Sequence, residues 1–590
     1  MFLSLMLALQ APPAAQFRDV GATALPDVKT TCGTAAKEYI IEVNGGGVAL
    51  GDFDGDGDPD LVVVDGSTLE RVQRYEAAND EERAKLGAPG YPPRLFLNQS
   101  TAAGIRFEPA GDAWKMSGGR WGMGCATGDF DGDGWLDLVV TQWGPTRLFL
   151  NQAGKGFREV DKPGFVGDGW STSAAAFDYD ADGWLDLAVI RYLAFDTREI
   201  ASRSAGKCRW KELPVMCGPE GLTPVHDQLF HNGGASAWRA REPVEGQPPP
   251  PPAGTSAFTD ATMSAGFRPS NAAFGLGAMP LDYDRDGDAD LFVANDSQPN
   301  CLWENRGGTF AEVGFARGVA TTSSGKELAS MGIGCNDVDG DGLAELFVTV
   351  FSGEENALFR PFERPPKNGA KLPPMFKESG GPLGLGGPSR PLLGWGTALE
   401  DYDHDGDLDA HVFNGHVYPQ ADEPGTDSSY AQQDQLYRNV SALRAKPKFA
   451  PELLSDAGPR VSRASAAADL DGDGDLDLVA LELGGSVRVL ENRGAQPDTH
   501  WLRVALRSAG PNTMALGARV TVKCGDVVRT REIRTSGGYQ AAIPPDAHFG
   551  LGAAAVVDEL EVVWPDGRVQ VLKSVPVDRA LTIQREEGSK

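Results

Sequence analysis

Short, unbroken apolar runs recur along most of the chain, and each one follows directly on a stretch of alternating acidic residues. The first example is DFDGDGDPDLVVV, in which five aspartates precede the apolar residues 61–64. A run of this length rich in β-branched residues is typical of a buried β-strand. The pattern begins again at six further places, so the chain holds copies that start at Asp52, Asp129, Asp178, Asp282, Asp337, Asp401 and Asp469.

Two more strand-like segments follow each acidic stretch. The first has the form Leu-aromatic-x-Asn, at residues 95–98, 148–151, 229–232, 302–305 and 436–439, with variants at 358–361 and 489–492. The second begins with a phenylalanine, at Phe107, Phe157, Phe258, Phe310, Phe376 and Phe449. The last copy has no such phenylalanine strand behind it, whereas Phe17 stands alone in front of the first copy.

This displacement predicts an all-β, seven-bladed β-propeller in which the N-terminal strand completes the last blade. Such closure removes the open sheet edges that a linear array would leave. A solenoid is the alternative, but it predicts capping repeats and has no use for an isolated strand at Phe17.

The two ends of the chain differ from the repeats. Residues 1–15 hold an apolar stretch followed by small residues and prolines, which predicts a secretory signal peptide, with a disordered N-terminus as the alternative. Residues 16–493 form the predicted propeller. Residues 494–590 alternate polar and apolar positions without an acidic loop, and predict a small C-terminal β domain. We therefore expect a secreted protein, extracellular or periplasmic, without membrane insertion, because no other segment is apolar for long enough to span a bilayer.

The charge balance narrows the classes of partner. The formal net charge is −29 over 590 residues, with 83 Asp and Glu against 54 Lys and Arg. Nucleic acids and anionic membranes both require a basic face, so neither is expected as a partner. An acidic chain of this kind is suited to binding cations.

The acidic stretches have the spacing of calcium-binding loops. Counted from the first Asp, positions 1, 3 and 5 are always Asp, position 6 is always Gly, and position 9 is always a carboxylate. A hard cation takes six to eight oxygen ligands, and glycine permits the sharp turn around it. About seven structural Ca²⁺ ions are therefore predicted, with these ligands: Asp52, Asp54, Asp56, Asp58 and Asp60; Asp129, Asp131, Asp133 and Asp137; Asp178, Asp180, Asp182 and Asp186; Asp282, Asp284, Asp286 and Asp290; Asp337, Asp339, Asp341 and Glu345; Asp401, Asp403, Asp405 and Asp409; Asp469, Asp471, Asp473 and Asp477.

The loops are not EF-hands. That motif needs a Glu at position 12 and flanking helices, whereas position 12 here is Val or Ala inside an apolar run. Each loop must then close with its position-9 carboxylate and lead into a strand, which we expect to be the innermost of its blade. Glu345 is longer than the aspartate found at position 9 elsewhere, so its site is expected to be altered.

These residues resemble the FG-GAP (VCBS-type) repeats of integrin α-subunit propellers over roughly residues 17–493. The stretches GLGAMPLDYDRDGDADLFVANDSQPNCLWENRGGTF and GWGTALEDYDHDGDLDAHVFNGHVYP resemble the cartilage acidic protein family and its bacterial relatives. From about residue 492, segments such as ALGARVTV and GGYQAAIPPDAHFGLG resemble the ASPIC/UnbV domain. The resemblance implies secretion, calcium binding and, for extracellular animal members, a matrix or adhesion role. It implies no established reaction.

A ligand could bind at one face of the ring. Long insertions at residues 66–93, 192–227 and 415–434 fall at the same junction of three repeats and should emerge together. If the strands after the loops are innermost, their polar ends would form a rim around the central channel. The predicted rim consists of Asp65, Gln142, Arg191, Asn295, Asn414 and Glu482. Strand-end polar groups that simply meet solvent are the alternative.

No sequence motif for catalysis is present. There is no GxSxG, HExxH, Walker or Rossmann signature, and His411 and His416 are expected to be structural. Among the seven cysteines, Cys208 and Cys217 lie close enough in the sequence to form a disulfide. The preferred hypothesis is a secreted calcium-binding protein that binds an extracellular protein or glycan. A calcium-scaffolded carbohydrate-active enzyme and an assembly component without its own ligand are the alternatives.

Overall fold

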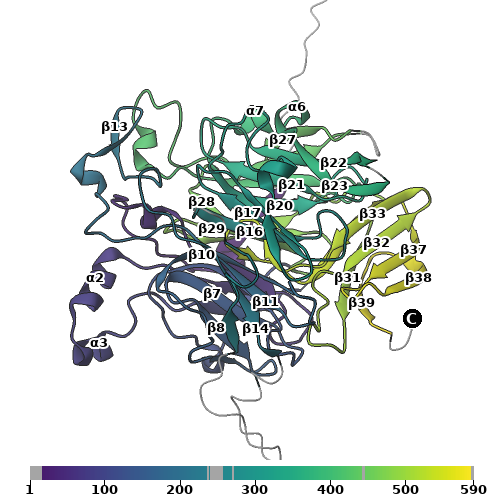
Figure 1. Cartoon of the computed structure of the whole chain (residues 1–590), viewed down its shortest axis with the longest axis horizontal. Helices are drawn as coiled ribbons and strands as arrows, with labels where there is room; N and C mark the ends of the chain where they lie inside the picture. The colour runs from purple at the N-terminus through teal and green to yellow at the C-terminus, as the bar shows by residue number, and fades with distance from the viewer. Residues whose placement is uncertain are drawn as a thin grey trace, which may run out of the picture.

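The computed structural model describes residues 16–101, 103–234, 238, 257–268, 272–367, 369–441 and 446–586. The predicted signal peptide lies outside these residues. The described chain is built almost wholly of β-strands (Figure 1). The helices are short: α1 (Gly21–Ala24), α2 (Leu69–Ala77), α3 (Asp80–Leu86), α5 (Gly314–Arg317), α6 (Gly380–Leu383) and α7 (Gly386–Ser389). Among the described helices, none is long and apolar enough to cross a membrane.

The strands before residue 493 pair into four-stranded antiparallel units. The first two units are β2 (Val48–Gly51), β3 (Asp60–Val63), β4 (Arg94–Asn98) and β5 (Phe107–Pro109), then β6 (Gly122–Gly128), β7 (Asp137–Gly144), β8 (Arg147–Asn151) and β9 (Phe157–Glu159). The third and fourth are β10 (Gly169–Phe177), β11 (Asp186–Arg191), β14 (Gln228–Asn232) and β15 (Phe258–Asp260), then β16 (Gly275–Leu281), β17 (Asp290–Asn295), β18 (Cys301–Asn305) and β19 (Phe310–Glu312). The fifth and sixth are β20 (Ser330–Asn336), β21 (Glu345–Val350), β22 (Ala357–Lys367) and β23 (Ala370–Glu378), then β24 (Gly394–Glu400), β25 (Asp409–Asn414), β26 (Gln435–Asn439) and β27 (Phe449–Leu453).

The last unit takes its fourth strand from the N-terminus, as the sequence predicts. Strands β28 (Ser462–Ala468), β29 (Asp477–Glu482) and β30 (Val487–Asn492) are completed by β1 (Phe17–Asp19), with Phe17 opposite Asn492. The Gln16 side chain donates hydrogen bonds to the carbonyl of Tyr402, at 2.6 Å, and to the side chain of Asn492, at 2.9 Å. The two ends of the repeat region are thereby joined.

The position of the innermost strand differs from the prediction. The first strands β2, β6, β10, β16, β20, β24 and β28 contact one another in succession, and β28 contacts β2. The strand after each acidic loop is therefore second in its unit, and the strand before the loop lies inside. The first strands have small residues, as in GMGCATG and SRASAAA, and small side chains permit the close approach that a crowded centre requires.

The C-terminal part forms two further sheets beside the repeat region, shown in yellow in Figure 1. One sheet has the order β36-β31-β39 and the other β33-β32-β37-β38. Their bounds are β31 (His500–Arg507), β32 (Arg519–Cys524), β33 (Val527–Glu532), β36 (Asp546–Gly552), β37 (Val556–Val563), β38 (Val569–Pro576) and β39 (Arg579–Gln584). Their apolar side chains belong to the same hydrophobic cluster as the first three units of the repeat region. The two parts therefore share a core.

A short hairpin of the C-terminal part enters the centre of the repeat region. It consists of β34 (Ser536–Gly537) and β35 (Ala541–Ala542), and β35 pairs in parallel with β2. The ring of Tyr539, which is fully buried, packs 4.9 Å from that of Trp395, and its hydroxyl donates to the Asn44 carbonyl at 3.1 Å. The hairpin contacts β6, β10, β16 and β28 as well, and Gly538 forms a bridge with Ile333 of β20. The segment thus fills the space among the first strands.

The N-terminal strand should be essential to stability. We expect Phe17→Ala to lower the free energy of unfolding by about 3 to 5 kcal/mol, because Phe17 is 1% exposed and its ring packs 5.5 Å from that of Tyr402. Chemical denaturation followed by tryptophan fluorescence measures the change. Arg18→Ala on the same strand is the control, since Arg18 is exposed and its replacement should cost under about 0.5 kcal/mol. Equal effects of the two substitutions would contradict this role of the strand.

Candidate metal centres in the acidic loops

Each acidic loop joins the first and second strands of its unit, and we number the loops one to seven in chain order. Carboxylate oxygens from positions 1, 3 and 9 lie within 4.8 Å of one another in the first four loops. These triads are Asp52, Asp54 and Asp60; Asp129, Asp131 and Asp137; Asp178, Asp180 and Asp186; and Asp282, Asp284 and Asp290. Oxygens at this spacing can share one hard cation.

The backbone of the loop folds around the position-1 carboxylate. In the first loop, the N–H groups of Gly55 and Gly57 donate to the two oxygens of Asp52, at 2.7 and 3.1 Å. Gly57 has a φ of +100°, which an L-residue rarely adopts, so glycine is needed at position 6. The sequence of the loop therefore sets its curl before any ion is considered.

The position-9 carboxylate is a structural anchor. Both oxygens of Asp60 accept backbone hydrogen bonds, from Phe53 at 3.0 Å and from Asn98 at 2.8 Å. The same pair of bonds occurs at Asp137, Asp186, Asp290 and Asp477. Each of these carboxylates holds its loop against the third strand of the unit, so position 9 would serve both the fold and an ion.

The asparagine of each Leu-aromatic-x-Asn strand links neighbouring loops. The Asn151 amide donates to Leu136 of its own loop, at 3.2 Å, and to Phe53 of the preceding loop, at 2.8 Å. The Asn98 amide reaches Leu470 of the seventh loop, at 2.9 Å. Equivalent bridges run from Asn232 to Phe130, from Asn305 to Tyr179 and from Asn492 to Tyr402. The loops are therefore tied to one another in a circular order.

The carboxylates are crowded and poorly hydrated. Burial, followed in most cases by the neighbouring carboxylates, raises the pKa of Asp60 to about 8, of Asp178 to about 7 and of Asp282 to about 6. Several oxygens in the loops are buried without a hydrogen-bond partner, among them Oδ1 of Asp178, Asp284, Asp401 and Asp471. Buried, unpartnered carboxylate oxygens are costly unless a cation meets them, so these residues fit a divalent ion.

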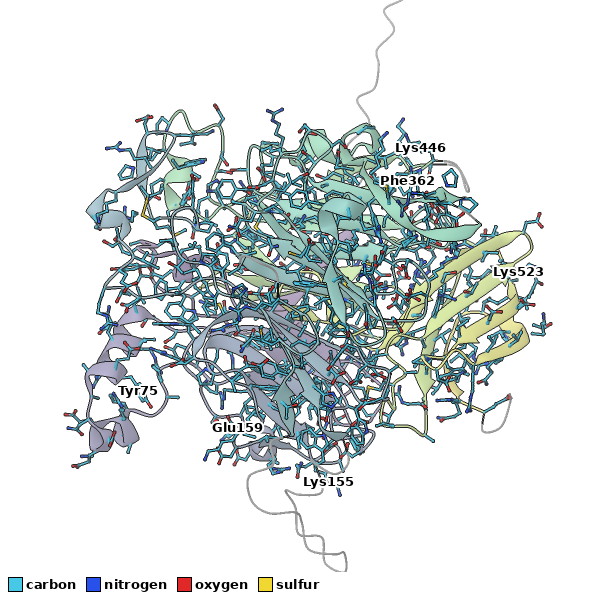
Figure 2. The ribbon with its side chains drawn as sticks, in the orientation of Figure 1. Tyr75, Lys155, Glu159, Phe362, Lys446 and Lys523 are labelled. Carbon is cyan, nitrogen blue, oxygen red and sulfur yellow. A yellow bond between two sulfur atoms is a disulfide. The ribbon has the colours of Figure 1, made fainter. Side chains whose placement is uncertain are left out.

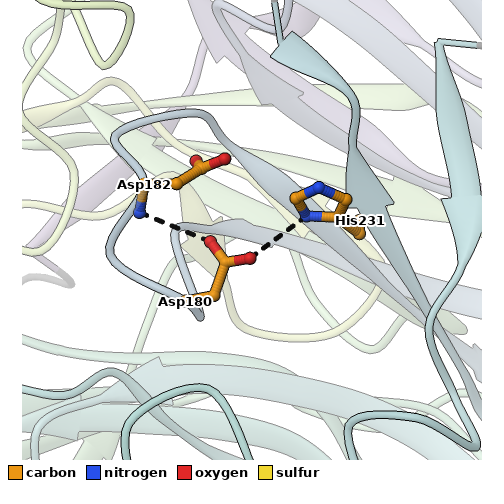
Figure 3. Close-up of side chains that lie close together, drawn as sticks. All are labelled: Asp180, Asp182 and His231. Carbon is orange, nitrogen blue, oxygen red and sulfur yellow. Dashed lines mark hydrogen bonds and ion pairs between the residues drawn. The ribbon is translucent and has the colours of Figure 1, made fainter.

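The third loop carries a histidine that sequence analysis missed. Nδ1 of His231 lies 3.2 Å from Oδ2 of Asp180 and 3.4 Å from Oδ1 of Asp186, and Asp182 completes a cluster with them (Figure 3). The hydrogen bond with Asp186 raises the pKa of His231 to about 9. The signal in the sequence was the variable position of the Leu-aromatic-x-Asn strand, which had been treated as unconstrained.

The C-terminal part packs against the acidic loops. Arg529 donates to the Gly406 carbonyl at 2.8 Å, and Thr513 donates to Oδ2 of Asp129 at 2.5 Å. The Trp501 ring lies so close to Gly474 that a Cβ there would be 2.0 Å from it, which requires glycine. This face of the repeat region is therefore covered by the protein itself, which the sequence did not indicate.

The predicted ligand rim lies at the other end of the second strands. Asp65 accepts from the Thr31 N–H at 2.6 Å, Gln142 from the Arg120 N–H at 2.9 Å, and Asn414 donates to the Gln433 carbonyl at 2.8 Å. Asn295 donates to Pro299 at 2.7 Å, Glu482 pairs with Arg460 at 3.0 Å, and the Arg191 N–H donates to Asp227 at 2.8 Å. Because their strands are second rather than innermost, these residues bond within their own units and do not surround a channel. The reason is that the small residues of the first strands take the central place.

The remaining candidates are placed as follows. His411 is buried and bonded to the Tyr402 hydroxyl at 2.6 Å, and burial lowers the pKa of both His411 and His416 to about 3. Both histidines therefore have the structural surroundings expected of them. Cys208 and Cys217 form a disulfide.

Comparison with known proteins agrees with the resemblance in the loops. A model described as FG-GAP-like repeat matches residues 129–189 and 282–348, and a model described as ASPIC and UnbV matches residues 508–590. Cartilage acidic protein 1 of Homo sapiens is 29% identical over 325 residues, which cover 54% of this chain and 44% of that protein. Its counterpart in Xenopus tropicalis is 30% identical over 293 residues, covering 48% and 40%. The chain thus spans less than half the length of these relatives.

Solved structures give a weaker likeness. A chain of BBS1N in complex with ARL6DN covers 81% of this chain and 97% of its own length, at 10% identity and a TM-score of 0.36. The extracellular domain of a hybrid two-component system from B. thetaiotaomicron covers 92% and 52%, at 10% identity and a TM-score of 0.35. Likenesses at these scores carry no argument about this chain.

The bridge between the first and last units can be tested through Asn98. We expect Asn98→Ala to lower the free energy of unfolding by about 1 to 3 kcal/mol, because it leaves the buried carbonyls of Pro59 and Leu470 without their donor. Urea titration measures the loss. Gln99→Ala is the matched control, since Gln99 is exposed. A loss for Asn98→Ala no larger than that of the control would contradict the bridge.

Proposed function

We propose that this chain, which carries FG-GAP-like repeats and a C-terminal ASPIC and UnbV domain, is a secreted, calcium-stabilised seven-bladed β-propeller that binds an extracellular protein or glycan. The blades are the four-stranded units, and the closed contact order of their first strands supports this reading. The observation that carries the calcium proposal is the set of buried, unpartnered carboxylate oxygens at the acidic loops.

Calcium would act here as a structural ion. Oxygen ligands at positions 1, 3 and 9 suit a hard cation, and the ion would offset the repulsion among carboxylates that burial has brought together. Extracellular calcium modules bind with dissociation constants of about 10⁻⁴ to 10⁻³ M. At ~1 mM calcium each site then adds about 0.4 to 1.4 kcal/mol to the folded state. Seven such sites would supply about 3 to 10 kcal/mol, comparable to the whole stability of a typical domain.

The binding surface is expected on the side away from the acidic loops. The C-terminal part covers the loops and its hairpin fills the centre, so neither place is free for a partner. Helices α2 and α3 belong to the insertion 66–93 and project on the side opposite the C-terminal part. Figure 2 shows the same separation through Tyr75 of α2 and Lys523 of β32. An exposed and extended insertion surface is the kind of place where a partner can dock without disturbing the ring.

Two of the three insertions support each other. In the insertion 192–227, the strands β12 (Cys208–Trp210) and β13 (Leu213–Val215) form a hairpin that is closed by the disulfide. The Trp210 ring packs 4.7 Å from the His416 ring of the insertion 415–434, and Lys211 donates to the Thr426 carbonyl. These contacts hold the two insertions as one surface, which favours binding of a macromolecule over binding in a deep pocket.

The stability of the protein should depend on calcium. We expect excess EGTA to lower the melting temperature by many degrees, and added Ca²⁺ to restore it, because only the folded loops bind the ion well. Differential scanning fluorimetry measures the shift. Asp178→Asn with Asp180→Asn should remove one ion and reduce the EGTA effect, whereas Asp161→Asn at an exposed position should not. A melting temperature that is the same with and without EGTA would refute the proposal.

Binding can be measured against a glycan array and a panel of extracellular matrix proteins. We expect a hit that is lost when residues 194–223 are replaced by a short Gly-Ser loop and kept when the exposed loop around Lys155 is mutated. A turnover assay on each hit separates binding from the carbohydrate-active enzyme, which would convert its ligand. Hits that survive loss of the insertion would place the binding surface elsewhere.

A further inference from the structure

One side chain on the third strand of each unit is placed to set the charge at the acidic loop. This residue, which we call the loop-facing residue, stands just before the asparagine or its replacement in the Leu-aromatic-x-Asn strand. The third strands pair with the second strands in the same register, as in Leu346 with Phe359 and Ala410 with Tyr437. In chain order the loop-facing residues are Leu97, Leu150, His231, Glu304, Arg360, Arg438 and Glu491.

Arg438 reaches the carboxylates of the sixth loop. Its Nη1 bonds to Oδ2 of Asp403, at position 3, and lies 3.9 Å from Oδ2 of Asp409, at position 9. Both carboxylates are 2% exposed or less, and this oxygen of Asp409 has no hydrogen-bond partner. The guanidinium thus stands against the two oxygens that a calcium ion would use.

Arg360 occupies the corresponding place at the fifth loop. Its Nη2 bonds to Oδ2 of Asp339, and its Nε lies 3.7 Å from Oε1 of Glu345. Position 9 of this loop lacks one of its usual donors, because the third strand has Pro361 where the others have asparagine, and proline has no N–H. Oε1 of Glu345 consequently accepts no hydrogen bond. Arg360 supplies the charge that compensates this oxygen.

The other loops have no guanidinium at this position. Leucine stands at the first and second loops, and glutamate at the fourth and seventh. Glu304 is engaged by Arg306 at 2.7 Å and Arg317 at 2.5 Å, and it still opposes ionisation of Asp284. His231 at the third loop is not a fixed charge, since an imidazole can lose its proton and bind an ion through nitrogen. Only the fifth and sixth loops therefore carry a permanent cation of their own.

We propose that Arg360 and Arg438 are built-in counter-ions of the fifth and sixth acidic loops, and that these two loops hold no calcium ion. A guanidinium is charged at every relevant pH and neutralises carboxylates directly. A divalent ion placed within about 4 Å of it would meet strong repulsion in a partly buried site. The inference rests on the proposed calcium binding of the remaining loops, and it predicts about five bound ions per chain.

The number of bound ions tests this inference. Full-length protein is equilibrated with ~2 mM CaCl₂, freed of excess ion by brief gel filtration in ~0.2 mM CaCl₂, and analysed by elemental mass spectrometry against protein concentration. We expect five ions per chain above the buffer for the wild type. Arg360→Leu and Arg438→Leu reproduce the leucine of the first two loops, and each should add one ion, so that the double variant binds seven.

Two controls keep the test independent of misfolding. Leu97→Arg introduces a guanidinium at the first loop and should reduce the count by one, and Arg364→Leu on the same strand as Arg360 should leave it unchanged. Near-ultraviolet circular dichroism establishes that each variant is folded. Seven ions in the wild type, or a count that Arg360→Leu and Arg438→Leu do not raise, would overturn the inference. No bound calcium in the wild type would instead overturn the proposed function.

Discussion

Buried carboxylates at the start of each second strand are the constraint on which the rest of this structure depends. The position-9 side chain accepts one N–H from its own loop and one from the third strand, as Asp60 does from Phe53 and Asn98. These bonds fix the loop, and they also bring the position-9 charge close to those at positions 1 and 3. The fold therefore concentrates negative charge at the same points where it secures its strands, and each loop needs positive charge in return.

The chain contains several kinds of such compensation. Arginine from the third strand meets the carboxylates at the fifth and sixth loops, and histidine meets them at the third. The C-terminal part adds Arg503, which lies 3.8 Å from Asp469, and Thr513, which donates to Asp129. The oxygens that remain unpartnered are the places where an ion would do the same work. Repeats with one sequence signature thus differ in how their charge is balanced.

The C-terminal part cannot be regarded as a separate appendage. It packs on the acidic loops, shares a hydrophobic cluster with the first units, and sends Tyr539 into the centre of the repeat region. Gly538 lies with φ of +51° and 2.8 Å from the Thr397 carbonyl where its Cβ would be, so the hairpin is fitted closely to the first strands. With this side closed, the side that bears the insertions is the one left for a partner.

The sequence by itself determined the repeats, the acidic loops, the strand order along the chain and the return of Phe17 to the last unit. These features depend on spacing within about 15 residues or on a missing partner that can be counted, so they are legible without coordinates. Only the tertiary structure decided which strand is innermost, that polar strand ends such as Asn414 bond within their own units, and that Tyr539 fills the centre. Only it showed that Arg360 and Arg438 face the acidic loops. Each of these depends on contacts between residues far apart in the chain, and the alternation of side chains along a strand does not say what lies across from it.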